Sequence, residues 1–129
     1  MTGPRNSHET TARRVDKPWG WELVWAETDT YVGKLLFVRA GESLSLQYHE
    51  AKDESWLVRE GRATLELGTV GGDLETTEIT PGDTFRFRPG TVHRLSALED
   101  TLVVEVSTPE LDDVVRLDDA YGREGTSAP

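Results

Sequence analysis

The sequence predicts an all-β protein in which antiparallel strands form a sandwich or a barrel. Short segments rich in β-branched and aromatic residues recur along the chain, and these residue types favour strands. Turn-forming sequences such as Pro81-Gly82-Asp83 and Pro89-Gly90 separate the segments. Between them the sequence has no amphipathic stretch of helix length. Many short strands at near-regular spacing are typical of sandwiches and barrels.

The expected strands can be placed in order along the chain. Residues 21–25 and 31–39 are rich in aromatic and β-branched side chains, and residues 43–49 alternate in character as a half-buried strand does. Further strands are expected at residues 55–59, 62–67, 74–79, 84–88, 91–97 and 102–107, with glycine-containing turns between most of them. Residues 111–121 are expected to form one short helix or a turn after the last strand.

The length of 129 residues is that of one domain with a real hydrophobic core. Residues 1–14 are polar and without periodicity, which predicts a flexible N-terminal arm. Residues 15–123 form the expected folded domain, and residues 124–129 a flexible C-terminal tail.

Composition restricts the partners and the compartment. The formal net charge of −10 argues against nucleic acid and against an anionic membrane surface. No apolar stretch is long enough to span a membrane and no signal-like region opens the chain, so a cytoplasmic protein is expected. An anionic substrate would need local lysine and arginine side chains. The absence of cysteine leaves histidine, carboxylate and amide groups as possible metal ligands.

Four residues form a candidate metal site. Gln47 and His49 are two apart on one expected strand, so their side chains point to the same face. Glu54 on the next strand and His93 on a later one would complete a set of two imidazoles, one amide and one carboxylate. Such a set suits one divalent metal ion, in the first place Zn²⁺, with Fe²⁺, Mn²⁺, Co²⁺ and Ni²⁺ as alternatives. Trp56 shares the parity of Glu54 and is expected to line the interior.

The spacing of these residues resembles the motifs of the cupin family. The first motif is matched by Gly41, Gln47, His49, Glu54 and Gly61, with glutamine where the first histidine usually stands, and the second by Gly82, Gly90 and His93. The resemblance implies a single-domain cupin β-barrel, a double-stranded jelly roll with the metal inside, over residues 15–123. It also implies a homodimer, in line with a free edge strand and an aromatic N-terminal segment.

Within the cupins, the chain resembles the type II phosphomannose isomerase (mannose-6-phosphate isomerase) domain. The shared sequences are Pro18-Trp19-Gly20, the run from Gly41 to Gln47, His93-Arg94-Leu95, Asp112 to Arg116, and Asp119 to Arg123. The chain departs from this group at Ala51, Lys52 and Ser55, where histidine, arginine and histidine are usual. The losses lie near the mouth of the expected site and spare the four metal ligands.

The resemblance implies a metal-dependent sugar-phosphate isomerase that interconverts mannose 6-phosphate and fructose 6-phosphate. Such a reaction needs a base, and Lys34 or Glu105 would supply it. Lys34 shares parity with Leu36, which would turn it inward as a base or a phosphate ligand, while an exposed lysine on an edge strand is the alternative. Arg94 and Arg116 would bind the phosphate of the substrate. For Arg116 an ion pair with a nearby aspartate is the alternative, and for Glu105 an ion pair in place of a role as base.

Two other functions fit the same residues. One is a different cupin enzyme, such as a dioxygenase or a sugar epimerase. The other is a non-catalytic cupin that binds a sugar or another small metabolite, which Ala51 and Ser55 favour because they remove two potential substrate contacts. All three readings share a small-molecule ligand, in the first place a sugar phosphate.

Overall fold

A computed structural model describes residues 7–110 and 112–127 and shows two antiparallel β-sheets and no helix in that part of the chain. The all-β prediction is therefore confirmed. The strands are β1 (Arg13–Lys17), β2 (Gly20–Glu27), β3 (Val32–Val38), β4 (Leu46–His49), β5 (Glu54–Glu60), β6 (Ala63–Thr69), β7 (Leu74–Ile79), β8 (Thr84–Phe87), β9 (Thr91–Ala97), β10 (Thr101–Ser107), β11 (Val114–Asp118) and β12 (Gly125–Ser127).

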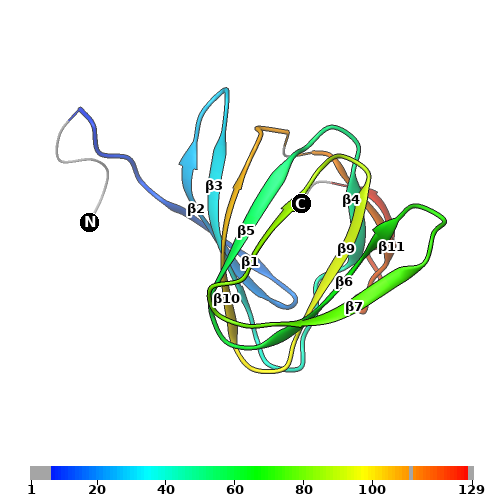
Figure 1. Cartoon of the computed structure of the whole chain (residues 1–129). Coiled ribbons are helices and arrows are strands. Elements are labelled where there is room, and N and C mark those ends of the chain that lie inside the picture. The colour runs from blue at the N-terminus through cyan, green and yellow to red at the C-terminus, as the bar shows by residue number, and fades with distance from the viewer. Residues whose placement is uncertain (1–6, 111, 128–129) are drawn as a thin grey trace.

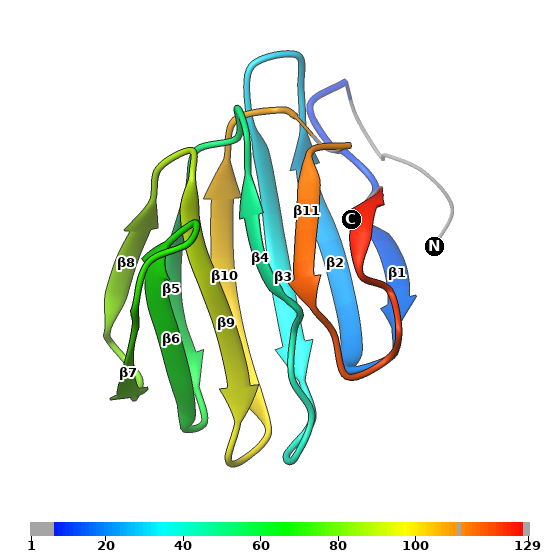
Figure 2. The same ribbon diagram turned by 90° about the vertical axis from the view of Figure 1, so that its right-hand side faces the viewer.

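The two sheets face each other as the layers of a jelly roll. One has the strand order β1-β2-β3-β10-β5-β8 and the other β12-β11-β4-β9-β6-β7. Figure 1 shows the first sheet on the left and the second on the right, and in Figure 2 the strand axes of the two sheets are roughly aligned. The jelly-roll fold is thus confirmed, but its two sheets are not hydrogen-bonded into one closed barrel.

Strand register brings polar residues from distant parts of the sequence onto two facing rows. In the first sheet Lys34, Glu105 and Trp56 are direct neighbours on β3, β10 and β5. In the second sheet Gln47 on β4 lies opposite His93 on β9. Because side chains alternate along a strand, each row points its members into the space between the sheets. The register therefore builds the interior site.

The apolar core closes one side of that site. It contains Trp56, Phe87 and Leu65, all at most 2% exposed. The rings of Phe87 and His93 stack with centroids 4.3 Å apart, and Trp56 meets His93 edge-on at 5.7 Å. Aromatic packing therefore fixes the orientation of the His93 ring. Trp56 lines the interior, as expected.

One motif glycine has a steric reason. Gly61 adopts a φ of 94°, in the left-handed region that favours glycine. A Cβ at this position would lie 2.2 Å from the carbonyl oxygen of Asp100. The turn between β5 and β6 therefore requires glycine where the family motif has it.

The largest difference from expectation lies after the last predicted strand. Residues 111–121 were expected to form a short helix or a turn, but Val114–Asp118 form β11, which pairs with β4. The β-branched pair Val114-Val115 favours a strand once a partner edge is available. That edge comes from β4, far away in the sequence, so no local pattern reveals it.

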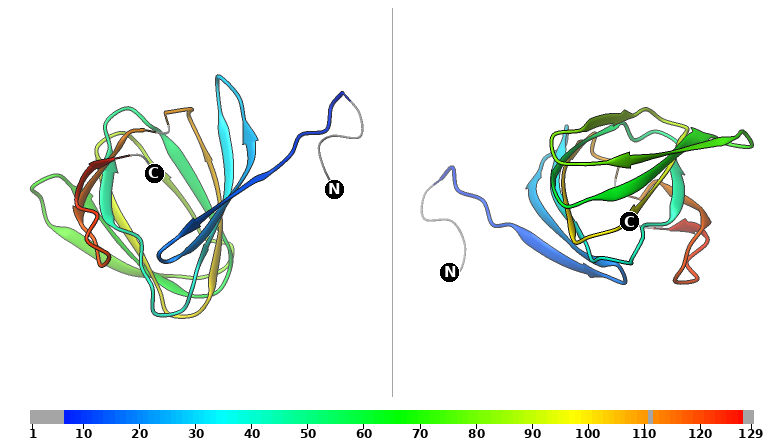
Figure 3. Two further views of the ribbon diagram at one scale, coloured as in Figure 1. Left: turned by 180° about the vertical axis from the view of Figure 1, so that it is seen from behind. Right: turned by 60° about the horizontal axis from the view of Figure 1, so that its bottom comes forward.

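The chain ends also differ in detail from the expected boundaries. β1 begins at Arg13, inside the expected arm of residues 1–14, and pairs with β2. β12 lies within residues 124–129, the expected tail, and pairs with β11. In Figure 3 residues 7–12, which precede β1, extend away from the sheets. Residues 1–6 of the expected arm and 128–129 of the expected tail lie outside the described residues. No helix in the described ranges is long and apolar enough to cross a membrane.

Candidate metal centre

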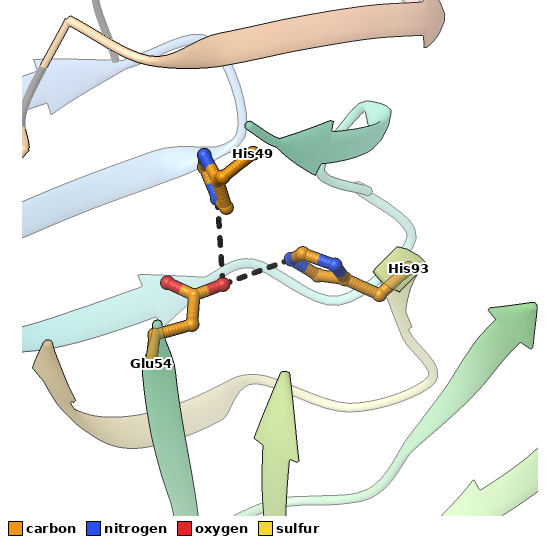
Figure 4. A group of neighbouring side chains, drawn as sticks. All are labelled: His49, Glu54 and His93. Atoms are coloured by element: carbon orange, nitrogen blue, oxygen red, sulfur yellow. Dashed lines mark ion pairs between the residues drawn. The ribbon is translucent and has the colours of Figure 1, made fainter. Parts of the chain in front are cut away.

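Three of the expected metal ligands converge between the sheets. His49 ends β4, Glu54 begins β5 and His93 lies on β9. Their potential ligand atoms all lie within 4.8 Å of one another, and all three residues are buried. Glu54 Oε1 is 3.5 Å from His49 Nε2 and 3.0 Å from His93 Nε2, as Figure 4 shows. Two ligands that each lie at about 2.0–2.2 Å from one ion have separations of this order.

The hydrogen bonds of the two imidazoles identify the nitrogen that each turns to Glu54. Nδ1 of His49 lies 2.8 Å from the carbonyl oxygen of Asp113, and Nδ1 of His93 lies 3.0 Å from that of Thr91. A carbonyl oxygen only accepts, so each Nδ1 must carry the hydrogen. In a neutral ring, Nε2 then presents a lone pair to the carboxylate. Backbone acceptors of this kind orient metal-binding histidines.

The central pair is unsatisfied without a cation. Glu54 Oε1 and His93 Nε2 are buried and make no hydrogen bond among the described residues. Two facing acceptors repel unless a proton or a metal ion lies between them, and an unsatisfied buried polar atom is costly. This donor set therefore fits a divalent metal ion.

The fourth expected ligand, Gln47, faces a cavity that lies between the sheets. Gln47 lines it together with His49 and Glu54. The side-chain oxygen of Gln47 accepts a hydrogen bond of 2.6 Å from Ser45 Oγ. This bond orients the amide, as the backbone carbonyls orient the imidazoles.

The cavity is small and mostly closed by side chains. Its volume is about 50 Å³, room for about one or two water molecules. Most lining residues are buried, and the partly exposed ones, Lys17, Gln47 and Arg123, mark its mouth. A ligand larger than a few atoms can enter only if the long side chains at this mouth rotate outward.

A buried lysine connects Glu54 to a second carboxylate. Lys52 Nζ lies 3.2 Å from Glu54 Oε2 and 3.6 Å from Glu105 Oε2. Burial disfavours the charge of Lys52, but Glu105 and Glu54 more than offset it and raise the pKa of Lys52. Burial also opposes the charge of Glu54, yet Lys52 and the two imidazoles hold the pKa of Glu54 well below its ordinary value.

The pKa of Glu105 is shifted in the opposite direction to that of Glu54. Glu105 Oε1 accepts a hydrogen bond of 3.0 Å from Trp56 Nε1. Burial, followed by the negative charge of Glu54, raises the pKa of Glu105 from 4.5 to about 7, although Lys52 and Lys34 act against the shift. A carboxyl group of this kind can exchange a proton near neutral pH.

The raised pKa of Glu105 predicts a pH-dependent stability for the metal-free protein. A folded-state pKa above the unfolded value stabilises the protein below about pH 4.5, and this contribution is lost as the pH rises through about 7. The Glu105 contribution to the free energy of unfolding is expected to fall by on the order of 3 kcal/mol over this window. Urea denaturation of wild type and Glu105→Gln at pH 5 and pH 8 measures it. An equal decline in both proteins would contradict the assignment.

The other expected site residues separate into two groups. Lys34 is buried at the cavity wall, with Nζ 3.4 Å from Glu22 Oε2, and Arg116 lines the same cavity from β11. Arg94 does not join them. It follows His93 on β9 and so points to the outer face, where it binds Glu66 at 2.7 Å and Asp118 at 2.8 Å. Of the two orientations left open for Lys34, the structure has the inward one, and it separates Arg94 from the cavity.

Asp113 organises the loop between β4 and β5. Its carboxylate accepts hydrogen bonds from the backbone N–H groups of Glu50, Ala51 and Lys52 at 2.8–3.1 Å. Burial opposes the charge of Asp113, but these bonds lower its pKa. Because the backbone carbonyl of Asp113 also orients His49, this residue positions both a candidate ligand and the loop that carries Lys52.

Replacement of Asp113 by alanine is expected to cost about 1–3 kcal/mol of stability, because three backbone donors lose their acceptor. The affinity for a metal ion is expected to fall less than in a ligand variant, since the backbone carbonyl that orients His49 remains. Chemical denaturation and metal titration measure the two effects. Unchanged stability would show that water replaces the carboxylate without loss.

Residues for which the sequence predicted no role complete the site. Lys52, Lys17, Arg123, Glu22 and Trp19 line the cavity. Lys52 lies two residues before Glu54 and four before Trp56, so the same strand parity that places Trp56 inside would have placed Lys52 there. Arg123 lies in a motif shared with the family, but the motif alone did not predict a function for it. Lys17 and Glu22 carried no signal, because only the pairing of β1 and β2 brings them to the cavity.

Solved structures share this architecture. An oxalate decarboxylase of Bacillus subtilis, studied for its Mn(II) centres, superposes with a TM-score of 0.69 at 18% identity, over 81% of this chain and 29% of that chain. KdgF from Halomonas sp. superposes with a TM-score of 0.62 at 26% identity, over 76% of this chain and 88% of that chain. These similarities confirm a cupin fold.

Sequence comparison identifies the family. A mannose-1-phosphate guanylyltransferase of Escherichia coli (strain K12) is 34% identical over 116 residues, 86% of this chain and 23% of that protein. The xanthan biosynthesis protein XanB of Xanthomonas campestris pv. campestris (strain B100) is 32% identical over 122 residues, 91% of this chain and 25% of that protein. The chain thus spans about a quarter of these relatives. The family model described as mannose-6-phosphate isomerase C-terminal matches residues 4–119, and the chain belongs to this family of cupins.

Proposed function

We propose that this chain is a metal-dependent sugar-phosphate isomerase of mannose-6-phosphate isomerase type. The observation that carries the proposal is the buried group of His49, Glu54 and His93, with the carboxyl group of Glu105 in the same interior. Family membership supports a mannose phosphate as the ligand. The guanylyltransferase activity named for the relatives belongs to proteins about four times as long.

The metal ligands in this proposal are Gln47, His49, Glu54 and His93. Their two imidazoles, one carboxylate and one amide suit Zn²⁺ in the first place and also Fe²⁺, Mn²⁺, Co²⁺ or Ni²⁺. When bound, the ion would supply a Lewis acid for the carbonyl and hydroxyl oxygens of the sugar.

The proton transfer is assigned to Glu105. An aldose becomes a ketose when a proton moves from C2 to C1 and the hydroxyl proton moves from O2 to O1, through an enediol. Glu105 takes the proton from C2 and returns it to C1, while Trp56 Nε1 holds its other oxygen in place. Lys34, held by Glu22 and next to Glu105 across β3 and β10, donates a hydrogen bond to a sugar oxygen. Arg116 is the arginine assigned to the phosphate.

A coupled assay tests the reaction. Wild-type protein loaded with each candidate ion in turn is incubated with mannose 6-phosphate, and fructose 6-phosphate is measured. Glu105→Gln is expected to lower kcat by at least about 100-fold, while Glu75→Gln, at an exposed position on β7, is the matched control. No turnover with any of the ions, or equal turnover in wild type and Glu105→Gln, would reject the assignment.

A second function is favoured by Lys52. Its ammonium group lies between Glu54 and Glu105, so it occupies the approach to the proposed base and holds both carboxylates. A cupin of this kind would bind a small sugar-derived metabolite without converting it. Calorimetric binding of mannose 6-phosphate without any turnover would select this function over the isomerase.

We also propose that two copies pair through the outer face of the first sheet. Exposed apolar side chains gather there, including Trp25 (44% exposed), Leu57 (39%) and Val106 (49%). An apolar groove of about 450 Å³ lies between β5, β8 and β10 on the same face. Sedimentation equilibrium of wild type and Val106→Glu tests this homodimer, and a monomeric wild type would refute it.

A further inference from the structure

Three basic side chains from the two ends of the chain meet at the cavity mouth. Lys17 ends β1, Arg116 lies on β11, and Arg123 follows β11, yet all three line one cavity. Lys17 and Arg123 are partly exposed and Arg116 is 7% exposed. The mouth is therefore rimmed by two cations with a third behind them.

The deeper cations of the cavity have carboxylate partners within the site. Lys34 pairs with Glu22, and Lys52 pairs with Glu54 and Glu105. At the mouth, Arg123 is held by Asp119 through two hydrogen bonds of 2.8 and 3.0 Å. The backbone of Lys17 pairs with Gly20 on β2, but its side chain forms no ion pair with any described residue. Among the described residues that line the mouth, basic groups thus outnumber acidic ones.

This concentration of positive charge runs against the rest of the molecule. The chain has a formal net charge of −10, so carboxylates to neutralise a cation are plentiful elsewhere. Burial lowers the pKa of Lys17, and Lys34, Arg116 and Arg123 lower it further against the effect of Glu22. Burial and Arg123 likewise lower the pKa of Arg116, against Asp119 and Glu22. The mutual repulsion of these groups would be relieved by an anion.

We propose that Lys17, Arg116 and Arg123 form a phosphate subsite at the mouth of the cavity. Two guanidinium groups and one ammonium group offer the charge-assisted donors that a phosphate oxygen prefers. Lys17 and Arg123 thereby gain a binding role, and Arg94 is replaced as the second phosphate arginine. The identity of the ligand as a sugar phosphate rests on the proposed function, whereas the phosphate subsite itself does not.

The register places this subsite beside the metal centre. Arg116 lies opposite Gln47, and Val114, two residues earlier on β11, lies opposite His49. Two residues of a strand span about 7 Å. A phosphate held at the mouth therefore leaves the other end of its ester directed toward His49 and Glu105. Lys17 and Arg123 must rotate to admit the ligand, and their partial exposure permits this.

Phosphate binding to metal-free protein tests the subsite separately from catalysis. The thermal midpoint is measured in the presence of a chelator against inorganic phosphate, with sodium chloride at equal ionic strength as the reference. The variants are Lys17→Gln and Arg116→Gln. The matched control is Arg59→Gln, which removes one positive charge from an exposed position on β5. Mannose 6-phosphate and mannose form two further arms.

We expect phosphate and mannose 6-phosphate to stabilise wild type and Arg59→Gln, and mannose not to. In Lys17→Gln the phosphate affinity is expected to fall about tenfold, as for the loss of one charge-assisted hydrogen bond, with the stability of the free protein unchanged or higher. Equal phosphate responses in wild type and Lys17→Gln, no response beyond chloride, or an equal response to mannose would overturn the subsite. Stabilisation by phosphate without isomerase turnover would refute the proposed reaction but support the phosphate subsite.

Discussion

Replacement of His49 or His93 by alanine is expected to abolish metal binding. Each substitution removes one of the three ligand atoms that lie within 4.8 Å of one another. Groups that only orient a metal ligand contribute about 10–100-fold to affinity, so the loss of a ligand itself is expected to exceed about 100-fold. Elemental analysis of protein purified without added metal, followed by titration with Zn²⁺, measures the effect.

The third histidine of the chain supplies the control. His8 is exposed and lies before β1, so His8→Ala is expected to bind metal as wild type does. Glu54→Gln preserves the shape of a ligand while removing its charge, which guards against loss of binding through misfolding of an alanine variant. Wild-type protein without bound metal after titration, or undiminished binding in both histidine variants, would refute the site.

Replacement of Lys52 by methionine is expected to destabilise the protein by about 3–5 kcal/mol near neutral pH. The ammonium group of Lys52 lies between two buried carboxylates, Glu54 and Glu105. Without it, the charged Glu54 and the partly charged Glu105, whose pKa is about 7, remain close together in the interior without their shared cation. Removing one partner of a buried ion pair is far more costly than removing both. Urea denaturation of the metal-free proteins gives the free energies of unfolding.

Two comparisons make the result specific. Arg86→Met breaks the exposed ion pair with Asp53, the residue next to Glu54, and is expected to cost no more than about 1 kcal/mol. Lys52→Met combined with Glu105→Gln is expected to recover part of the lost stability, since one of the stranded charges is gone. If Lys52→Met and Arg86→Met were equally stable, Lys52 would have no role in neutralising the buried carboxylates.

Three of the four candidate metal ligands could be predicted from short-range patterns. Gln47 and His49 share a strand face by alternation, and the offset to Glu54 follows from one turn between neighbouring strands. His93 lies far away in the sequence and was found through the family motif. The fold class was equally accessible, since strand-forming segments and turns are local properties. β11 was missed because the edge that stabilises it is supplied by β4.

The remaining site residues depend on pairings that no local pattern contains. Arg94 and His93 are adjacent in sequence, but strand alternation directs Arg94 to the outer face and His93 toward Glu54 in the interior. Strand parity with Glu54 is enough to turn Lys52 inward, and the loop held by Asp113 fixes it there. Lys52 neutralises Glu54 and Glu105, which lie on the different strands β5 and β10.

By itself, the sequence determined the all-β class, the cupin family and the set of residues able to bind a metal ion. These follow from local alternation, turn chemistry and motif spacing. The tertiary structure alone decided which cations face the cavity, that Glu105 lies in the field of Glu54 and Lys52, and that Lys17 meets Arg116 and Arg123. The physical reason is that burial and the distance between charges set the electrostatics of a site, and both depend on strands that meet only in the folded chain.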